Sequence, residues 1–362
     1  QGQTNGEYPF YKVGDISNNA IAGKIYLELC NNYISSDVAK MIKGCILPKD
    51  TVVFAKIGEA LKLNRRAITS CDCLIDNNAM GIAPKLDSLR IQYFYFCMKN
   101  LKMQTLAEST TVPSVRKTVL EKYEIEVPSL VEQEEIEKKL TLTQKIIEKR
   151  RQELSYLDEI IKARFVEMFG NPVTNEKGWK QRQLGEITTK IGSGATPKGG
   201  KEAYQEEGIT LIRSMNVHNG LFEYKELAHI SEEQAEKLDN VTIEENDVLL
   251  NITGASVARS CVVPSKILPA RVNQHVCIIR CNQCIVPEFL NKLLVDDNYQ
   301  RLLWSIAEAG ATREAITKQQ VESLQIIMPP IELQEQFADF VHQVDKSKFD
   351  TMTFAPIYDI IN

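Results

Sequence analysis

Lysine and arginine side chains gather at several points of this 362-residue chain, close to glycine and hydroxyl-bearing residues. The densest patch is Lys62-Leu63-Asn64-Arg65-Arg66, which follows an apolar run that breaks at Gly58. Cationic side chains on loops, together with backbone amides and hydroxyls, are the groups that bind phosphate oxygens. A solvated surface loop has the same composition. The patch therefore predicts either phosphate contacts, with Lys62, Arg65 and Arg66 as candidates, or a plain solvated loop.

A glycine-rich segment, residues 192–201, offers similar chemistry through Thr196, Lys198 and Lys201. It does not match a nucleotide-binding P-loop, because Ala195 stands where the first Gly belongs and Glu202 where Ser or Thr belongs. We therefore expect no ATP site here. Close approach to a nucleic-acid backbone and a structural turn remain as alternatives.

Further candidates lie at the ends of predicted strands and helices. Asn216 has the side chain to read adenine, but a turn at a strand end explains it equally well. Residues before a predicted helix can hold a phosphate or simply cap the helix. The candidate residues in these positions are Arg116, Lys117, Arg213, Asn216, Ser256, Arg259, Thr312 and Arg313.

The cysteines and histidines form no pattern typical of a catalytic or metal site. Cys281-Asn282-Gln283-Cys284 with Cys277 and His275 resembles half of a zinc site, but no second pair follows at a suitable spacing. A thiol or metal enzyme is the corresponding alternative. We also find no Ser-His-Asp arrangement, no methyltransferase tetrad and no nuclease carboxylate signature. The sequence predicts a non-catalytic binding protein with no metal and no cofactor.

Composition sets the limits of the problem. Hydrophobic residues make up 43% and charged residues 25%, enough to build two globular domains. No apolar run is long enough for a membrane span, and the first residues resemble no secretory signal. Nine cysteines in apolar stretches indicate reduced thiols, so we expect a cytoplasmic protein. The net charge is −5 and no segment of the chain is strongly basic, so any DNA contact must come from local clusters of cationic residues.

An internal repeat organises the chain, with an offset of roughly 200 residues between its two copies. Residues 50–60 resemble residues 247–256, and 77–82 resemble 273–278; a helical stretch follows in each copy. Each copy closes with a proline and a helix start, at 127–134 and at 328–335. We expect two related domains, at 1–128 and 171–328, the first lacking a counterpart of the opening Trp179–Pro197.

A long helix is predicted between the copies, at residues 129–170. Ser129 and Glu132 have the spacing of a capping box, and Gly170-Asn171-Pro172 ends the helix. Apolar residues spaced four and three apart indicate a coiled-coil seam. One ordinary helix packed on its own domain is the alternative. The predicted seam residues are Ile136, Leu140, Ile147, Leu154, Leu157 and Ile161.

A second, shorter helix is predicted at 329–346 as the antiparallel partner, through Leu333, Phe337 and Phe340. The tail at 347–362 loses this pattern, and its role stays unassigned.

Several motifs follow one another in a fixed order. They are Arg164–Pro172, Gly178-Trp179, Leu184–Ile187, Gly192–Pro197 and the two proline-led helix starts. In this order they resemble the specificity subunits of type I restriction-modification systems. The resemblance covers roughly residues 8–345. It implies two target-recognition domains of mixed sheet and helices, separated by a long antiparallel coiled-coil helix pair. Each domain would read half of a split site on double-stranded DNA.

The same resemblance implies that two modification (methyltransferase) subunits and restriction subunits dock on the chain and carry out the chemistry. A coiled-coil adaptor that binds proteins rather than DNA is the alternative function. Duplex binding that weakens steeply with salt distinguishes the two.

Overall fold

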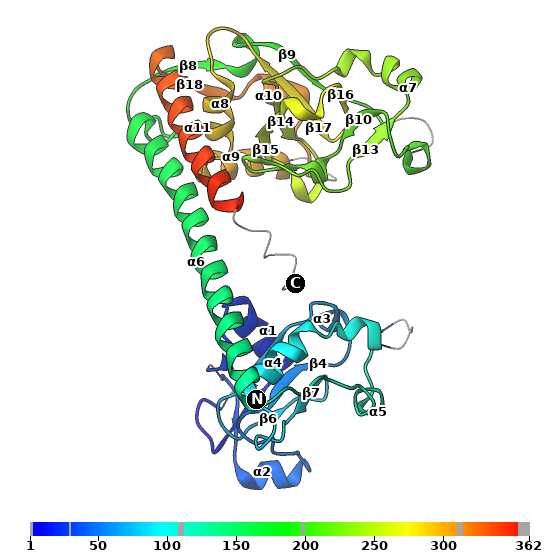
Figure 1. Cartoon of the computed structure of the whole chain (residues 1–362). Helices are drawn as coiled ribbons and strands as arrows, with labels where there is room; N and C mark the ends of the chain where they lie inside the picture. Colours follow the sequence, from blue (N-terminus) through cyan, green and yellow to red (C-terminus); the bar gives the residue numbers. More distant parts are fainter. Residues whose placement is uncertain (1–2, 29, 108–111, 197–199, 310–313, 354–362) are drawn as a thin grey trace. The chain divides into compact units, whose positions relative to one another are not determined.

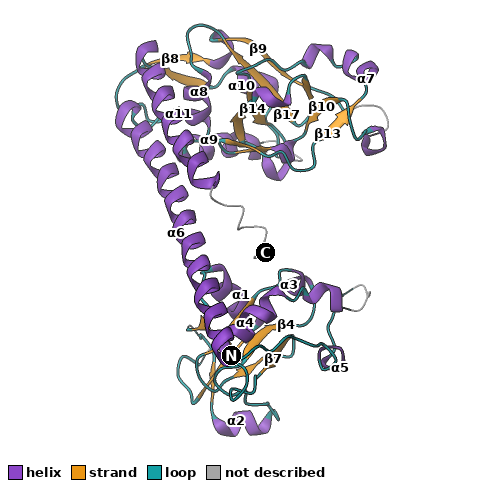
Figure 2. Ribbon diagram, viewed as in Figure 1, coloured by secondary structure: helices purple, strands orange, loops and turns teal. Residues whose placement is uncertain are grey.

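The computed structural model describes residues 3–28, 30–107, 112–196, 200–309 and 314–353. Within them the chain forms two compact units, residues 3–153 and residues 154–352. One continuous helix, α6 (Leu130–Phe169), begins in the first unit and ends in the second (Figure 1). Each unit mixes sheets with helices (Figure 2), which confirms the expected α+β class.

The first unit is built around a four-stranded sheet with the order β2-β5-β4-β7. The same unit contains a second, three-stranded sheet with the order β3-β1-β6. Its elements are β1 (Tyr8–Tyr11), α1 (Val13–Ile21), β2 (Tyr26–Leu27), β3 (Tyr33–Ile34), α2 (Ser36–Met41), β4 (Val52–Ala55), α3 (Glu59–Lys62), β5 (Arg66–Thr69), β6 (Leu74–Ile75), β7 (Ala79–Ile82), α4 (Ile91–Asn100) and α5 (Lys117–Leu120).

The second unit has a four-stranded sheet with the order β15-β14-β17-β9, a three-stranded sheet β13-β10-β16, and the pairs β11-β12 and β8-β18. Its elements are β8 (Lys180–Gln183), β9 (Thr188–Ser193), β10 (Ile209–Ile212), β11 (Val217–His218), β12 (Leu221–Phe222), β13 (Ala228–Ile230), α7 (Glu232–Glu236), β14 (Val248–Asn251), β15 (Ser260–Val262), β16 (Ala270–Val272), β17 (Val276–Cys281), α8 (Pro287–Leu294), α9 (Asp297–Glu308), α10 (Lys318–Glu322), β18 (Gln325–Met328) and α11 (Ile331–Thr353).

The central strands of the two units occupy the same place in the same pattern. Strand β4 pairs antiparallel with β5 and β7, and β14 pairs antiparallel with β15 and β17. Val52 is opposite Ile68, as Val248 is opposite Val262. Because side chains of a strand alternate between its two faces, each central strand feeds two cores. The repeat inferred from sequence is thus a repeat of structure.

A buried glutamine fixes the helix that closes each repeat. Gln133 Nε2 donates to the carbonyls of Ser88 at 3.0 Å and Pro128 at 2.8 Å, and its Oε1 accepts the Arg90 N–H at 2.8 Å. Its side chain therefore joins the first turn of α6 to the start of α4.

Gln334 makes the corresponding bonds in the second unit. Its Oε1 accepts the Val286 N–H at 3.0 Å, and its Nε2 donates to Pro329 at 2.9 Å and to Cys284 at 3.5 Å. Both glutamines are 0% exposed. The proline-led starts at 127–134 and 328–335 therefore resemble each other because each contains a glutamine whose side-chain amide makes equivalent hydrogen bonds.

The two ends of α6 pack into the cores of the units to which they belong. Ile136 and Leu140 pack against the core around α4, while Ile161, Phe165 and Phe169 are buried in the core of the second unit. Between these ends Ile147, Leu154 and Leu157 are half-buried, whereas most of their neighbours are exposed. The apolar residues spaced four and three apart thus form one face of α6 that is buried or half-buried along its length. At its beginning that face meets the helix α4 of its own domain.

Within the second unit, α6 and α11 run antiparallel. The Phe337 ring lies 5.5 Å from that of Phe165, and the Arg164 guanidinium lies 5.9 Å from the Phe340 ring. Farther along, Lys348 pairs with Asp158 at 2.6 Å. Leu333 is partly buried against the same core. Helix α11 ends at Thr353, so the boundary expected at 346 is wrong; polar pairs continue the helix after its apolar pattern stops.

Among the residues described, no helix combines the length and the apolar character that crossing a bilayer requires.

Candidate nucleic-acid interface

In the first unit, the loop after the central strand β4 is tied to the segment before α5. Gly58, with a φ of 78°, donates its N–H to the Pro113 carbonyl at 2.8 Å, and Val115 donates to the Lys56 carbonyl at 2.9 Å. The positive φ explains the glycine, because other residues rarely adopt it. Two candidate groups distant in sequence therefore sit on segments that are bonded together. Lys62, at the end of α3, and Arg65 belong to one segment, and Arg116 with Lys117, at the start of α5, to the other.

The second unit repeats this connection after β14. Gly254, with a φ of 70°, donates to the Glu314 carbonyl at 2.9 Å, and Ile316 donates to the Ile252 carbonyl at 2.8 Å. The loop carries the half-buried candidates Ser256 and Arg259. The candidates Thr312 and Arg313 lie outside the described residues.

Arg65 and Arg259 occupy equivalent positions at the end of these two loops. Each follows a residue in the left-handed region, Asn64 with a φ of 52° and Ala258 with a φ of 71°. Each directly precedes the strand that pairs with the central strand, and each is half-buried. A non-glycine residue with positive φ is uncommon, so its presence at the same step indicates one shared loop geometry. That geometry places one cation at the same point of each repeat.

Arg66, in contrast, is buried and unsuited to direct contact with DNA. It is 2% exposed, and its guanidinium donates to the Asn64 carbonyl at 2.7 Å and to the Leu101 carbonyl at 2.7 Å. Burial lowers its pKa to about 10. Arg65 and Arg66 are adjacent at the start of β5, where side chains alternate between the two faces, and their shared residue type does not tell which of the two faces the core. The prediction of a surface contact at Arg66 is corrected accordingly.

Asn216 closes a turn and does not present its amide to solvent. It is 0% exposed; its Oδ1 accepts the Arg213 N–H at 3.1 Å and its Nδ2 donates to the Glu223 carbonyl at 3.0 Å. In the first unit Asp15 accepts the Lys12 N–H at 2.8 Å at the matching turn after β1. The alternative of a strand-end turn is therefore right for Asn216, and its proposed reading of adenine is wrong.

Arg213 is half-buried beside this turn. Its guanidinium lies 5.5 Å from the centre of the Tyr204 ring and donates to the Glu226 carbonyl. This packing holds the side chain against the domain, so any contact with DNA would have to compete with it.

A short polar chain links the glycine-rich segment to the loop after β14. The Thr196 hydroxyl bonds to Gln274, the Gln274 amide contacts His275 Nε2 at 3.1 Å, and His275 Nδ1 contacts the Thr253 hydroxyl. Gln274 is exposed. The sequence signal for this loop is the polar Asn273-Gln274-His275 just before an apolar run, which indicates a loop at a strand end. Lys198 and the side chain of Lys201 lie outside the description.

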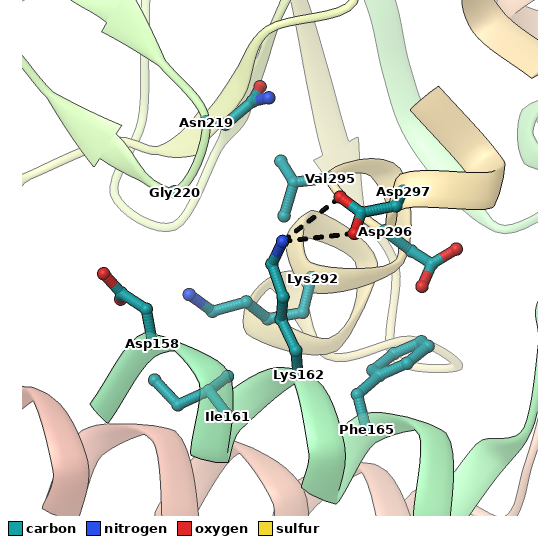
Figure 3. A pocket seen from close by; sticks show the side chains of 10 residues that line it. All are labelled: Asp158, Ile161, Lys162, Phe165, Asn219, Gly220, Lys292, Val295, Asp296 and Asp297. Atoms are coloured by element: carbon teal, nitrogen blue, oxygen red, sulfur yellow. Dashed lines mark hydrogen bonds and ion pairs between the residues drawn. The ribbon is translucent and has the colours of Figure 1, made fainter. Parts of the chain in front are cut away.

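A cavity of about 320 Å³ opens in the second unit beside α6 (Figure 3). Lys162 Nζ lies 3.1 Å from Asp297 Oδ1 within it, and Asp158 and Lys292 also line it. Burial lowers the pKa of Lys292. Acidic and basic side chains are mixed here, so the cavity does not favour a polyanion.

The cysteine cluster has the properties of packed thiols. Cys277 is 1% exposed, and burial raises the pKa of both Cys277 and Cys281 to about 12, which keeps them protonated. Over the described residues, no three His, Cys, Asp or Glu side chains are grouped so that they could hold a metal ion.

Fold and site together define a tandem recognition protein: one α+β unit occurs twice, with a matching loop pair in each copy. Comparison with known proteins gives the family. The type I restriction modification DNA specificity domain matches residues 2–156 and 176–356, and the chain belongs to this family. It is a DNA sequence-specificity subunit, as expected, and the coiled-coil adaptor is not favoured. Such a subunit is non-catalytic; catalysis belongs to separate methylase and restriction subunits.

Relatives in sequence agree with this assignment. The chain is 23% identical over 360 residues to the type I restriction enzyme MjaIX specificity subunit of Methanocaldococcus jannaschii, covering 93% of this chain and 79% of that protein. It is 22% identical over 270 residues to the MjaVIII specificity subunit of the same organism, covering 70% and 63%.

Solved structures share the fold. A chain from a structure of type I R-M system assembly and conformational transition aligns over 98% of this chain and 88% of its own length, with 16% identity and a TM-score of 0.55. The type I restriction-modification system S subunit from M. genitalium aligns over 99% and 88%, with 14% identity and a TM-score of 0.51.

Proposed function

We propose that each repeat reads one half of a bipartite site on double-stranded DNA through its bonded loop pair. The observation that carries this proposal is the equivalence of the two loops: the same positive-φ glycine, the same ties to the segment before a short helix, and an arginine at the same step. Phosphate contacts from such loops fix the register on the duplex, and neighbouring polar groups read base edges.

We further propose that residues 1–128 and 171–328 are the two target-recognition domains and that residues 129–170 and helix α11, Ile331–Thr353, serve as spacer helices. In this proposal, helix length sets the gap between half-sites. Two modification subunits and the restriction subunits assemble on the chain and carry out methylation and cleavage. The nine free cysteines support a reducing, cytoplasmic location for this assembly.

Salt dependence of duplex binding tests the loop assignment. Phosphate neutralisation releases counterions, so the logarithm of the affinity should fall linearly with the logarithm of salt concentration. Arg65→Ala and Arg259→Ala should each weaken binding and lower the slope by about 1. Lys85→Ala, which changes an exposed lysine outside both loops, is the control. A flat salt response, or equal slopes in all variants, would contradict the proposal.

A further inference from the structure

The first unit contains a strongly cationic cavity of about 410 Å³, distinct from the one in Figure 3. It is lined by residues of α1, α3, α4 and α6 and by the loop before β5. Among the described residues that line it, none is an aspartate or glutamate, whereas six are cations: Lys24, Lys62, Arg65, Arg66, Lys99 and Arg151.

Carboxylates at the surface of the site pair with two of these cations. Lys24 pairs with Glu28 at 2.5 Å and Lys62 with Glu59 at 2.7 Å, both at the exposed surface. In the described structure, the buried Arg66 guanidinium bonds only to neutral oxygens, at Asn64 and Leu101. Removing a cation from water without a counter-charge is costly. Because neutral oxygens do not cancel its charge, Arg66 contributes a net positive potential to the cavity.

Two further observations support a binding site for an anion in this cavity. Burial, and then the charges of Arg151 and Arg66, lower the pKa of Lys99. One buried donor of a lining residue, the Arg66 Nε–H, has no hydrogen-bond partner in the part of the chain that is described. An anion in the cavity would relieve the repulsion and the uncompensated charge together.

We propose that this cavity is a phosphate-binding site. Arginine and lysine together offer the forked and point-charge donors that suit a tetrahedral anion. A cavity of this size takes an inorganic phosphate or one phosphate group at its mouth. Arg65 belongs both to the cavity and to the loop assigned to DNA, so a backbone phosphate is one source; that source rests on the proposed function, whereas binding of the free anion does not.

The second unit lacks the central cation of this site, which fixes the stoichiometry. Arg66 lies opposite Phe54 in the β4–β5 pair, and Ser260 lies at the matching place, opposite Leu250. The proposal therefore gives one phosphate per chain.

Calorimetric titration of inorganic phosphate into the full chain without DNA, with sodium chloride holding ionic strength constant, tests the site. We expect saturable binding of one phosphate per chain. Lys99→Met should weaken it about tenfold, the effect of losing one charge-assisted contact, and Arg65→Ala should weaken it similarly. Lys99→Arg, which keeps the charge, and Lys85→Met, which changes an exposed lysine elsewhere, should bind as the native chain does.

A second titration, of a short duplex with and without phosphate, separates the sources. Competition that Lys99→Met abolishes assigns the site to a backbone phosphate, and independent binding assigns it to the free anion; either supports the proposal. Absence of saturable phosphate binding, or equal affinity in Lys99→Met and the native chain, overturns it. Circular dichroism of each variant identifies any that fails to fold, and Arg65→Ala, at a half-buried position, then carries the test.

Discussion

The two buried glutamines give the sharpest test of the repeat, because each should stabilise only its own unit. Gln133→Met keeps the length of the side chain but removes bonds to Ser88, Arg90 and Pro128. At about 1 kcal/mol net per hydrogen bond, the loss should be about 3 kcal/mol. Gln334→Met removes the corresponding three bonds and should cost about the same. The loss should be slightly smaller, because the bond to Cys284, at 3.5 Å, is long and contributes less.

Tryptophan fluorescence can tell the units apart, because both tryptophans of the chain, Trp179 and Trp304, lie in the second unit. In urea unfolding, Gln334→Met should lower the fluorescence midpoint by about 1 M, from the loss above and an m-value of about 2–3 kcal/mol/M. Gln133→Met should leave that midpoint near the native value while circular dichroism shows earlier loss of helix.

The matched controls are Gln104→Met in the first unit and Gln319→Met in the second, both exposed glutamines. Neither should move a transition. Equal shifts of the fluorescence midpoint in Gln133→Met and Gln334→Met, or no shift in Gln334→Met, would refute the reasoning.

Three further predictions follow from single contacts. Asp247→Asn should cost about 3–5 kcal/mol in urea unfolding, because the buried Asp247 carboxylate makes two 2.8 Å bonds to Arg280; a loss below about 1 kcal/mol would contradict this. Iodoacetamide should modify exposed thiols in the native chain and buried ones only after unfolding, as peptide mass mapping would show; early reaction of the buried set would count against the structure. The exposed set is Cys45, Cys71 and Cys284, and the buried set is Cys73, Cys261 and Cys277. Hydrogen bonds from Ser129 lower the pKa of Glu132, so this cap stabilises the folded chain above the ordinary carboxyl pKa, and its contribution is lost as pH falls through the lowered pKa. The difference in unfolding free energy between the native chain and Ser129→Ala should therefore shrink in acid. A difference that grows in acid would contradict this assignment.

The repeat and the long helix could be predicted from sequence because they depend on local patterns. Ser129 and Glu132 form the expected capping box, with the Ser129 N–H donating to Glu132 at 2.9 Å. The seam positions from Ile136 to Ile161 are buried or half-buried as their spacing indicates. Such patterns follow from helix geometry alone.

The fine structure of the interface could not be predicted, because it depends on tertiary contacts. Arg65 and Arg66 are chemically identical neighbours, yet only the fold buries one of them. Residue type alone makes Asn216 a candidate for base contact, whereas the fold gives its side chain three backbone partners. The end of α11 depends on Lys348 reaching Asp158, a contact between residues far apart in sequence.

The most direct measurement is a map of methylated bases in the DNA of cells that carry this chain with its modification partner. Two reading units of one design predict a motif in two specified halves, separated by a constant number of unspecified bases. A contiguous motif, or a gap that varies from site to site, would contradict the account.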